Sequence, residues 1–210
     1  MTLELLTELM DHASVLVFAL TGALVASRAQ LDLVSFIFFA TLTGIGGGTL
    51  RDLLLGQDPV FWVRRPSLLM LTSAAATLVF FTAHLFESRY RLLLWLDALA
   101  LAVAVPAGVG VAIEVGAHPA ATVAMGVITG TFGGMARDVV ANELPMVLKQ
   151  GELYVTAAFG GAVATVALMA VRCPQPYALL ACAIVVLGLR VGSLTLGWKL
   201  PTYRARPPRN

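Results

Sequence analysis

The sequence predicts an all-α integral membrane protein with seven transmembrane helices, arranged as an inverted 3+3 repeat plus a seventh helix. Three observations support this fold class. The chain has 210 residues, of which 59% are hydrophobic and only 12% charged, whereas soluble domains carry about 25% charged residues. Apolar runs long enough to cross about 30 Å of hydrocarbon recur along the chain. The second half of the sequence also repeats a pattern from the first half.

Seven apolar runs are interpreted as membrane spans, and prolines mark the start of three of them. Pro66, Pro119 and Pro176 lie at span starts, where a proline fits the first helical turn. The predicted spans are 11–27, 33–55, 66–86, 92–115, 119–140, 152–171 and 176–196. We expect a single membrane domain at 1–198, with repeat one at about 11–86, repeat two at about 92–171 and the extra helix at about 176–196. Residues 199–210, rich in proline and basic residues, are predicted to form a disordered cytoplasmic tail.

Basic residues near the span ends predict the orientation, because Lys and Arg are enriched on the cytoplasmic side of a membrane. One side holds eight of them: Arg28, Arg89, Arg91, Lys149, Lys199, Arg204, Arg206 and Arg209. The other side holds three: Arg64, Arg65 and Arg172. The C-terminus is therefore expected in the cytoplasm and the N-terminus outside. The net charge of +2 is too small to indicate a nucleic acid partner.

Two stretches carry the internal repeat, LTGIGGGTLRD from Leu42 and ITGTFGGMARD from Ile128. An offset of 86 residues aligns them without a gap. The same offset aligns Asp11 with Asp97 further upstream. Each repeat holds three spans, and an odd number of crossings reverses the direction of the chain. The second copy is therefore inverted in the membrane, as in many transporters, whose working sites lie near the midplane.

Two clusters of small residues lie at matched places, each midway along its span. Their members are Thr43, Gly44, Gly46, Gly47, Gly48, Thr129, Gly130, Gly133 and Gly134. In one interpretation the glycines kink or unwind the second and fifth spans and free backbone carbonyls, which suit a dehydrating K⁺ or Na⁺ beside a watery path. In the other, the glycines let two helix backbones pack closely. Both interpretations can hold together.

An Arg-Asp pair follows each glycine cluster by about one helical turn, and an aspartate opens the first and fourth spans on the matching sides. We expect two symmetric charge clusters that border the path and hold or gate it. These are Asp11–Arg51–Asp52 on the outer side and Asp97–Arg137–Asp138 on the inner side. The alternative is anchoring, in which each arginine extends to the lipid headgroups and each aspartate caps a helix. Arg190 in the seventh span is expected to reach the inner face in that way.

The sequence predicts neither an enzyme nor a metal or cofactor site. It contains no Ser-His-Asp, Walker, HExxH or dinucleotide-binding fingerprint, and Cys173 and Cys182 lack the spacing of metal ligands. A passive cation channel, a small-solute transporter and a purely structural membrane protein remain open as functional classes. Phe38, Phe39 and Phe132 are candidates either for hydrophobic plugs in the path or for lipid-facing positions.

The paired motifs G-x-G-G-G-x-x-R-D at 44–52 and G-x-x-G-G-x-x-R-D at 130–138 resemble those of the trimeric intracellular cation (TRIC) channel family, bacterial type. Some bacterial members of that family have been described as glycine transporters. The resemblance covers about residues 10–195. It implies a homotrimer in the cell membrane, with lipid around it and one pore in each protomer along the second and fifth spans.

The same resemblance implies that the pore passes K⁺ and also Na⁺, with little discrimination between them. A secondary transporter of a small solute such as glycine is the alternative function. Animal members of the family carry a Lys-Glu-Val tripeptide linked to gating and lipid binding, and this sequence has no such tripeptide. Gating of that particular kind is therefore not expected here.

Overall fold

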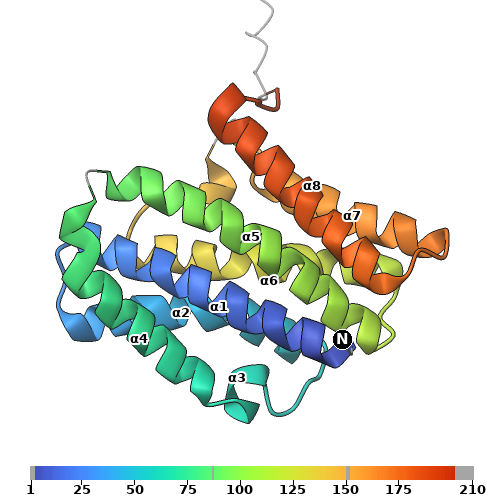
Figure 1. The fold of residues 1–210 in the computed structure, drawn as a ribbon, viewed down its shortest axis with the longest axis horizontal. Helices are drawn as coiled ribbons and strands as arrows, with labels where there is room; N and C mark the ends of the chain where they lie inside the picture. Colours follow the sequence, from blue (N-terminus) through green and yellow to red (C-terminus); the bar gives the residue numbers. More distant parts are fainter. Residues whose placement is uncertain (1–2, 87, 150–151, 202–210) are drawn as a thin grey trace, which may run out of the picture.

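Seven long helices pack into one bundle in the computed structural model, which describes residues 3–86, 88–149 and 152–201 (Figure 1). They are α1 (Leu3–Arg28), α2 (Leu33–Leu54), α4 (Ser67–Thr82), α5 (Arg89–Glu114), α6 (Pro119–Val140), α7 (Val155–Ala170) and α8 (Gln175–Leu196). Shorter pieces lie in the connections: α3 (Phe61–Arg64), η1 (Ala83–Leu85) and η2 (Met146–Leu148). Helices α1 and α5 pack against each other, and α2 packs against α6.

The helix boundaries follow the 86-residue offset, so the predicted 3+3 repeat is confirmed. Helix α5 begins and ends 86 residues after α1, and α6 begins and ends 86 residues after α2. Helices α4 and α7 are both 16 residues long. Helix α8 follows the second repeat and packs against α5 and α7. In Figure 1, α7 (orange) and α8 (red) lie side by side. Helix α8 has no counterpart after the first repeat.

Five helical stretches in the described residues are long and apolar enough to cross a membrane: Glu8–Arg28, Leu33–Leu54, Ser67–Leu85, Arg89–Glu114 and Gln175–Leu196. Helix α7 is apolar but shorter. Helix α6 has the same length as α2 and takes the same place in the repeat. The predicted spans agree with the helices except at the start of α1, which begins at Leu3 because helical hydrogen bonding continues beyond the apolar run.

Helix α2 begins at a capping aspartate. The Asp32 side chain accepts a hydrogen bond from the Ser35 backbone N–H at 2.8 Å. This bond holds the pKa of the Asp32 carboxyl below its ordinary value. Because the folded-state pKa is lowered, the stabilisation by this cap is present at neutral pH and is lost only as the pH falls through that lowered pKa.

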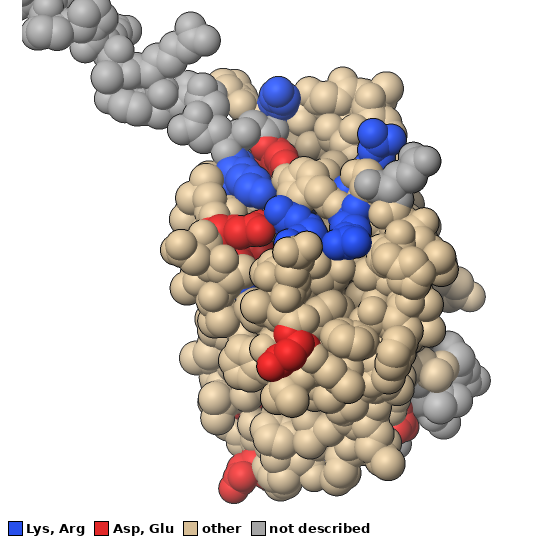
Figure 2. Space-filling view, turned by 90° about the vertical axis from the view of Figure 1, so that its left-hand side faces the viewer, with Lys and Arg blue, Asp and Glu red and all other residues tan. Residues whose placement is uncertain are grey.

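One end of the bundle gathers basic side chains with a few acidic ones beside them, as Figure 2 shows. Here Arg28, at the end of α1, pairs with Glu143 at 3.1 Å. Arg89, at the start of α5, donates through Nη1 to a backbone carbonyl near the end of α1 at 3.2 Å. The Tyr90 ring centroid lies 5.0 Å from the Arg28 guanidinium and 5.3 Å from the Lys149 ammonium. We call this end of the bundle the basic end.

Candidate functional site

Helices α2 and α6 are in backbone contact where the two glycine clusters meet. A Cβ atom on Gly47 would overlap the carbonyl oxygen of Thr129, and a Cβ atom on Gly133 would overlap the carbonyl oxygen of Thr43. These two contacts are related by the repeat offset. Only glycine permits so close an approach. We call this contact the α2–α6 crossing, and it lies where the two repeats face each other.

Thr43 and Thr129 lie at the centre of the crossing. Each buried hydroxyl donates to the carbonyl four residues earlier on its own helix, at 2.6 Å in both copies. Each threonine also packs against a glycine on a further helix: Gly22 of α1 lies against Thr43, and Gly108 of α5 against Thr129. The crossing thus brings four helices together through small side chains. The backbones of α2 and α6 are in direct contact there, so the crossing is closed in this structure.

Unwinding, one of the two effects predicted for the glycines, is not found, whereas a kink stays a prediction. Helix α2 is continuous from Leu33 to Leu54 and α6 from Pro119 to Val140, so neither is unwound at its glycines. In a buried contact between two helices, the absence of side chains favours close packing while the backbone hydrogen bonds stay within each helix. The other glycines also lie against neighbouring atoms: Gly44, Gly46, Gly48, Gly130 and Gly134.

The first charge cluster joins α1 to the end of α2. Arg51 donates through Nε to Asp52 Oδ1 at 2.8 Å and through Nη1 to Asp11 Oδ1 at 3.2 Å. Its side chain is buried, with the residue 1% exposed, and its guanidinium lies 5.3 Å from the ring centroid of Phe61. Arg51 is therefore a buried, paired charge. It does not extend to the headgroups as the anchoring alternative requires.

The second charge cluster repeats this arrangement between α5 and α6. Arg137 donates through Nε to Asp138 Oδ1 at 2.8 Å and through Nη1 to Asp97 Oδ1 at 3.2 Å. It also donates to the Thr21 hydroxyl of α1 at 2.8 Å. Arg137 and Asp97 are 0% exposed. The structure thus brings together the residues of both clusters, and it leaves no room for anchoring by Arg137.

The second oxygen of Asp52 and of Asp138 holds the connection that follows its helix. Asp52 Oδ2 accepts from the Phe61 backbone N–H at 2.7 Å, and Asp138 Oδ2 accepts from the Met146 backbone N–H at 3.0 Å. Sequence reasoning missed these contacts, because a backbone donor leaves no trace in residue type. The only signal was a proline shortly after each helix, at matched places in the repeat.

We expect Asp138→Asn to loosen the connection after α6. An amide has one acceptor oxygen and cannot serve both the Arg137 Nε–H and the Met146 N–H. The loss of one hydrogen bond to a charged acceptor should speed amide exchange around Met146 by about tenfold, as hydrogen–deuterium exchange mass spectrometry would measure. Asp58→Asn, at an exposed acidic residue, is the control. Equal exchange in Asp138→Asn and the unmodified protein would contradict this role of Asp138.

The two charge clusters differ in their surroundings. The first borders a cavity of about 140 Å³ that opens between α1, α2 and α5. Its lining includes Glu8, Gln57, Arg64, Arg65 and Glu114 as well as the cluster itself. The second cluster is instead covered by Tyr154, at the start of α7, and by Arg190 of α8. Tyr154 is 1% exposed and Arg190 is 0% exposed.

Arg190 corrects a prediction, because it does not reach the membrane surface. It pairs through Nη1 with Glu152 Oε2 at 3.4 Å, and its guanidinium lies 5.0 Å from the ring centroid of Tyr154. The partners of Arg190 precede it by nearly forty positions and lie outside the repeated motif. The sequence therefore offered no pattern that joined them.

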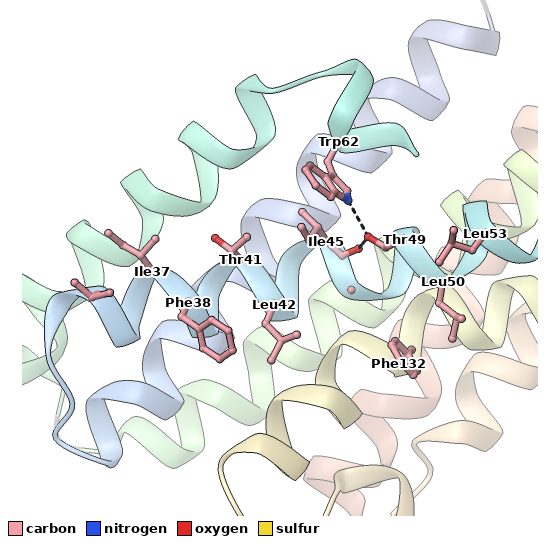
Figure 3. A pocket seen from close by; sticks show the side chains of 12 residues that line it. Ile37, Phe38, Thr41, Leu42, Ile45, Thr49, Leu50, Leu53, Trp62 and Phe132 are labelled. Atoms are coloured by element: carbon pink, nitrogen blue, oxygen red, sulfur yellow. Dashed lines mark hydrogen bonds between the residues drawn. The ribbon is translucent and has the colours of Figure 1, made fainter. Parts of the chain in front are cut away.

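A groove of about 700 Å³ runs along the exposed side of α2 (Figure 3). Phe38 and Phe132 line it, whereas Phe39 is buried in the core. Figure 3 shows the Trp62 indole beside the groove, where its Nε1 donates to Thr49 Oγ1 at 3.0 Å. Phe38 and Phe132 therefore lie beside the α2–α6 crossing, in the groove on the exposed side of α2.

The fold and the site define a class of protein: a helical membrane protein of two inverted repeats, with two buried Arg–Asp clusters on either side of a glycine crossing. The protein family described as "Glycine transporter" matches residues 8–84 and again residues 94–170. The chain is 38% identical over 199 residues to the UPF0126 inner membrane protein YadS of Escherichia coli K12, covering 92% of this chain and 94% of that protein.

Two solved structures share the fold at high similarity. The TRIC trimeric intracellular cation channel orthologue from Rhodobacter sphaeroides has a TM-score of 0.88 and 44% identity, over 91% of this chain and 98% of that one. A prokaryotic TRIC channel in 0.5 M KCl has a TM-score of 0.87 and 25% identity, over 94% of this chain and 100% of that one. The chain belongs to the TRIC channel family, whose members are not enzymes.

Proposed function

We propose that this protein is a monovalent cation channel, passing K⁺ and also Na⁺, with one path in each protomer of a homotrimer. The observation that carries the proposal is the α2–α6 crossing with an Arg–Asp cluster on each side of it. The Rhodobacter sphaeroides relative, described as a trimeric cation channel, supports both the activity and the assembly.

The proposed path follows α2 and α6 between the two charge clusters. Asp11 and Thr21, which contact the two cluster arginines, are ten residues apart on α1, or about 15 Å along a helix. The crossing at Thr43 and Thr129 is closed in this structure, so conduction requires α2 and α6 to separate there. In each cluster the carboxylates offset an arginine that would otherwise repel cations.

We further propose that the basic end faces the cytoplasm, since Lys and Arg are enriched on that side of membranes. The description of YadS as an inner membrane protein supports a cell-membrane location, with lipid surrounding the trimer. The division into repeats at about 11–86 and 92–171, followed by an extra helix, stays part of this proposal. So does the cytoplasmic tail at 199–210, of which residues 202–210 lie outside the described residues.

A secondary transporter for a small solute such as glycine is the alternative. The description of the family favours it. So does the cavity at the first cluster, because its lining offers both carboxylates and guanidinium groups to a small zwitterion. Both functions use the same inverted repeat, and only a transport measurement separates them.

Recording from the purified protein in planar lipid bilayers tests the proposal. We expect unitary current steps with K⁺ as the only cation, and steps of comparable size with Na⁺, because carbonyl and carboxylate oxygens suit both ions. Protein-free bilayers are the control. In parallel, proteoliposomes loaded with labelled glycine are expected to show no exchange. Glycine exchange without ionic current would reverse the choice in favour of the transporter.

A further inference from the structure

Helix α8 lies outside the repeat and delivers a buried cation to only one of the two charge clusters. Arg190 is fully buried, although it stands in an apolar helix where a charge is costly. It contacts the Tyr154 ring and the Glu152 carboxylate. Tyr154 and Arg190 both interact electrostatically with Asp97. The extra helix is thus connected to the second cluster through a chain of polar groups.

Some buried polar atoms in this region lack a hydrogen-bond partner. Among the described residues, three buried guanidinium nitrogens here have no hydrogen-bond partner: Arg137 Nη2, Arg190 Nε and Arg190 Nη2. Buried groups of this kind are costly to leave unpaired, so such a cluster favours a rearrangement that pairs them. The free donors of Arg190 and the nearby carboxylate of Asp97 supply the components of a second arrangement.

The space at Gly134 shows how closely these groups converge. A Cβ atom placed on Gly134 would lie 3.2 Å from Tyr154 Oη and 3.6 Å from both Arg137 Nη2 and Asp97 Oδ1. The matching residue of the first repeat, Gly48, instead faces the apolar ring of Phe61. The second cluster therefore has a polar neighbour where the first cluster has a hydrocarbon one.

Among the described residues, none of α8 lines the cavity at the first cluster, and a different cation covers this cluster. Its covering cation, Arg65, comes from within the repeat and is 3.5 Å from Glu8 and 3.9 Å from Asp11. The Arg65 side chain is 38% exposed, and it lines the open cavity. The two ends of the proposed path are thus unequal: one is open to a polar cavity, and the other is covered by α8.

We propose that Arg190 is a lock that holds the basic end of the path closed, by fixing α8 and the start of α7 over the second charge cluster. Arg190 acts through Glu152 and Tyr154 and is a positioning residue. When it leaves Glu152 and turns toward Asp97, α8 loosens and that end opens. The effect on current rests on the proposed channel function, whereas the effect on α8 does not.

The native Cys182 tests the lock without any need for current. It is buried on α8 against Gly161 of α7, about two turns before Arg190. In a Cys173→Ser background, we expect Arg190→Gln to raise the rate of Cys182 alkylation by N-ethylmaleimide about tenfold, within the range usual for coupling between two sites. Arg190→Lys, which keeps the charge but not the planar fork, should restore most of the protection.

Two further variants keep this test decisive. Lys199→Gln removes an exposed cation close to the same end of α8 and should leave the alkylation rate unchanged. Glu152→Gln weakens the lock from a partly exposed position, so it carries the test if Arg190→Gln does not fold. Unchanged alkylation in both Arg190→Gln and Glu152→Gln would overturn the lock.

Bilayer recordings of the same variants provide a second measurement, the open probability, which a purely structural role of Arg190 would leave unchanged. We expect Arg190→Gln to raise the open probability about tenfold, with Arg190→Lys close to the unmodified protein and unitary conductance unchanged. An unmodified protein without current would refute the channel and leave the alkylation result to decide on the lock. A conducting protein with unchanged open probability in Arg190→Gln would refute the lock alone.

Discussion

Gly47→Ala is expected to lower the free energy of unfolding by about 3 kcal/mol, at the upper end of the usual range for overpacking. The new methyl group would overlap the carbonyl oxygen of Thr129, a backbone atom that moves only if α6 moves with it. Gly133→Ala should have the same effect through the carbonyl oxygen of Thr43. Denaturant titration of the purified protein in detergent micelles, followed by circular dichroism, measures both losses.

Gly46→Ala is the matched control in the same run of glycines. Its Cβ atom would lie 3.5 Å from the Cα atom of Gly133, which is an ordinary van der Waals contact. Alanine is also favoured over glycine within a helix by about 1 kcal/mol, so this variant should be neutral or slightly more stable. Equal losses for Gly46→Ala and Gly47→Ala would show that the close α2–α6 crossing is not present in the folded protein.

The repeat and the charge clusters could be predicted from the sequence, because the two halves carry the same residues at matched positions. Arg51 and Arg137 stand at matched positions, each with an aspartate directly after it and another forty positions before it. A duplicated pairing of this kind has few explanations other than contact. The two copies are held by equal distances, 2.8 Å to the adjacent aspartate and 3.2 Å to the distant one.

The conformation of the glycine segments could not be predicted from the sequence. Glycines such as Gly47 and Gly133 permit both a broken helix and a close helix contact, and the sequence pattern is the same for both. The choice depends on what lies opposite, which is the backbone at Thr129 and Thr43. Arg190 escaped prediction for a different reason: its contact with Glu152 occurs once, outside the repeat, so no second copy identifies it.

Arg137→Met is expected to cost about 3–5 kcal/mol, the usual loss when one partner is removed from a buried ion pair. Asp97 and Asp138 would lose the one cation that is ion-paired with both, in a part of the protein that is closed to solvent, and the nearby Arg190 is ion-paired with Glu152 instead. Arg51→Met removes the matching arginine of the first cluster, and we expect a smaller loss. There, Asp11 borders a polar cavity, and Arg65 lies 3.9 Å from its second oxygen, so a cation and solvent remain available to it.

The comparison between the two variants is sharper than either loss alone, because the repeat supplies the same three residues in both copies. If burial behind α8 is what makes the loss of Arg137 costly, then also removing the unpaired charge of Asp97 should recover part of the lost stability. Arg137→Met combined with Asp97→Asn is therefore expected to be more stable than Arg137→Met alone, as measured by unfolding in detergent. Equal losses for Arg51→Met and Arg137→Met would mean that the open cavity and the α8 cover do not distinguish the two ends.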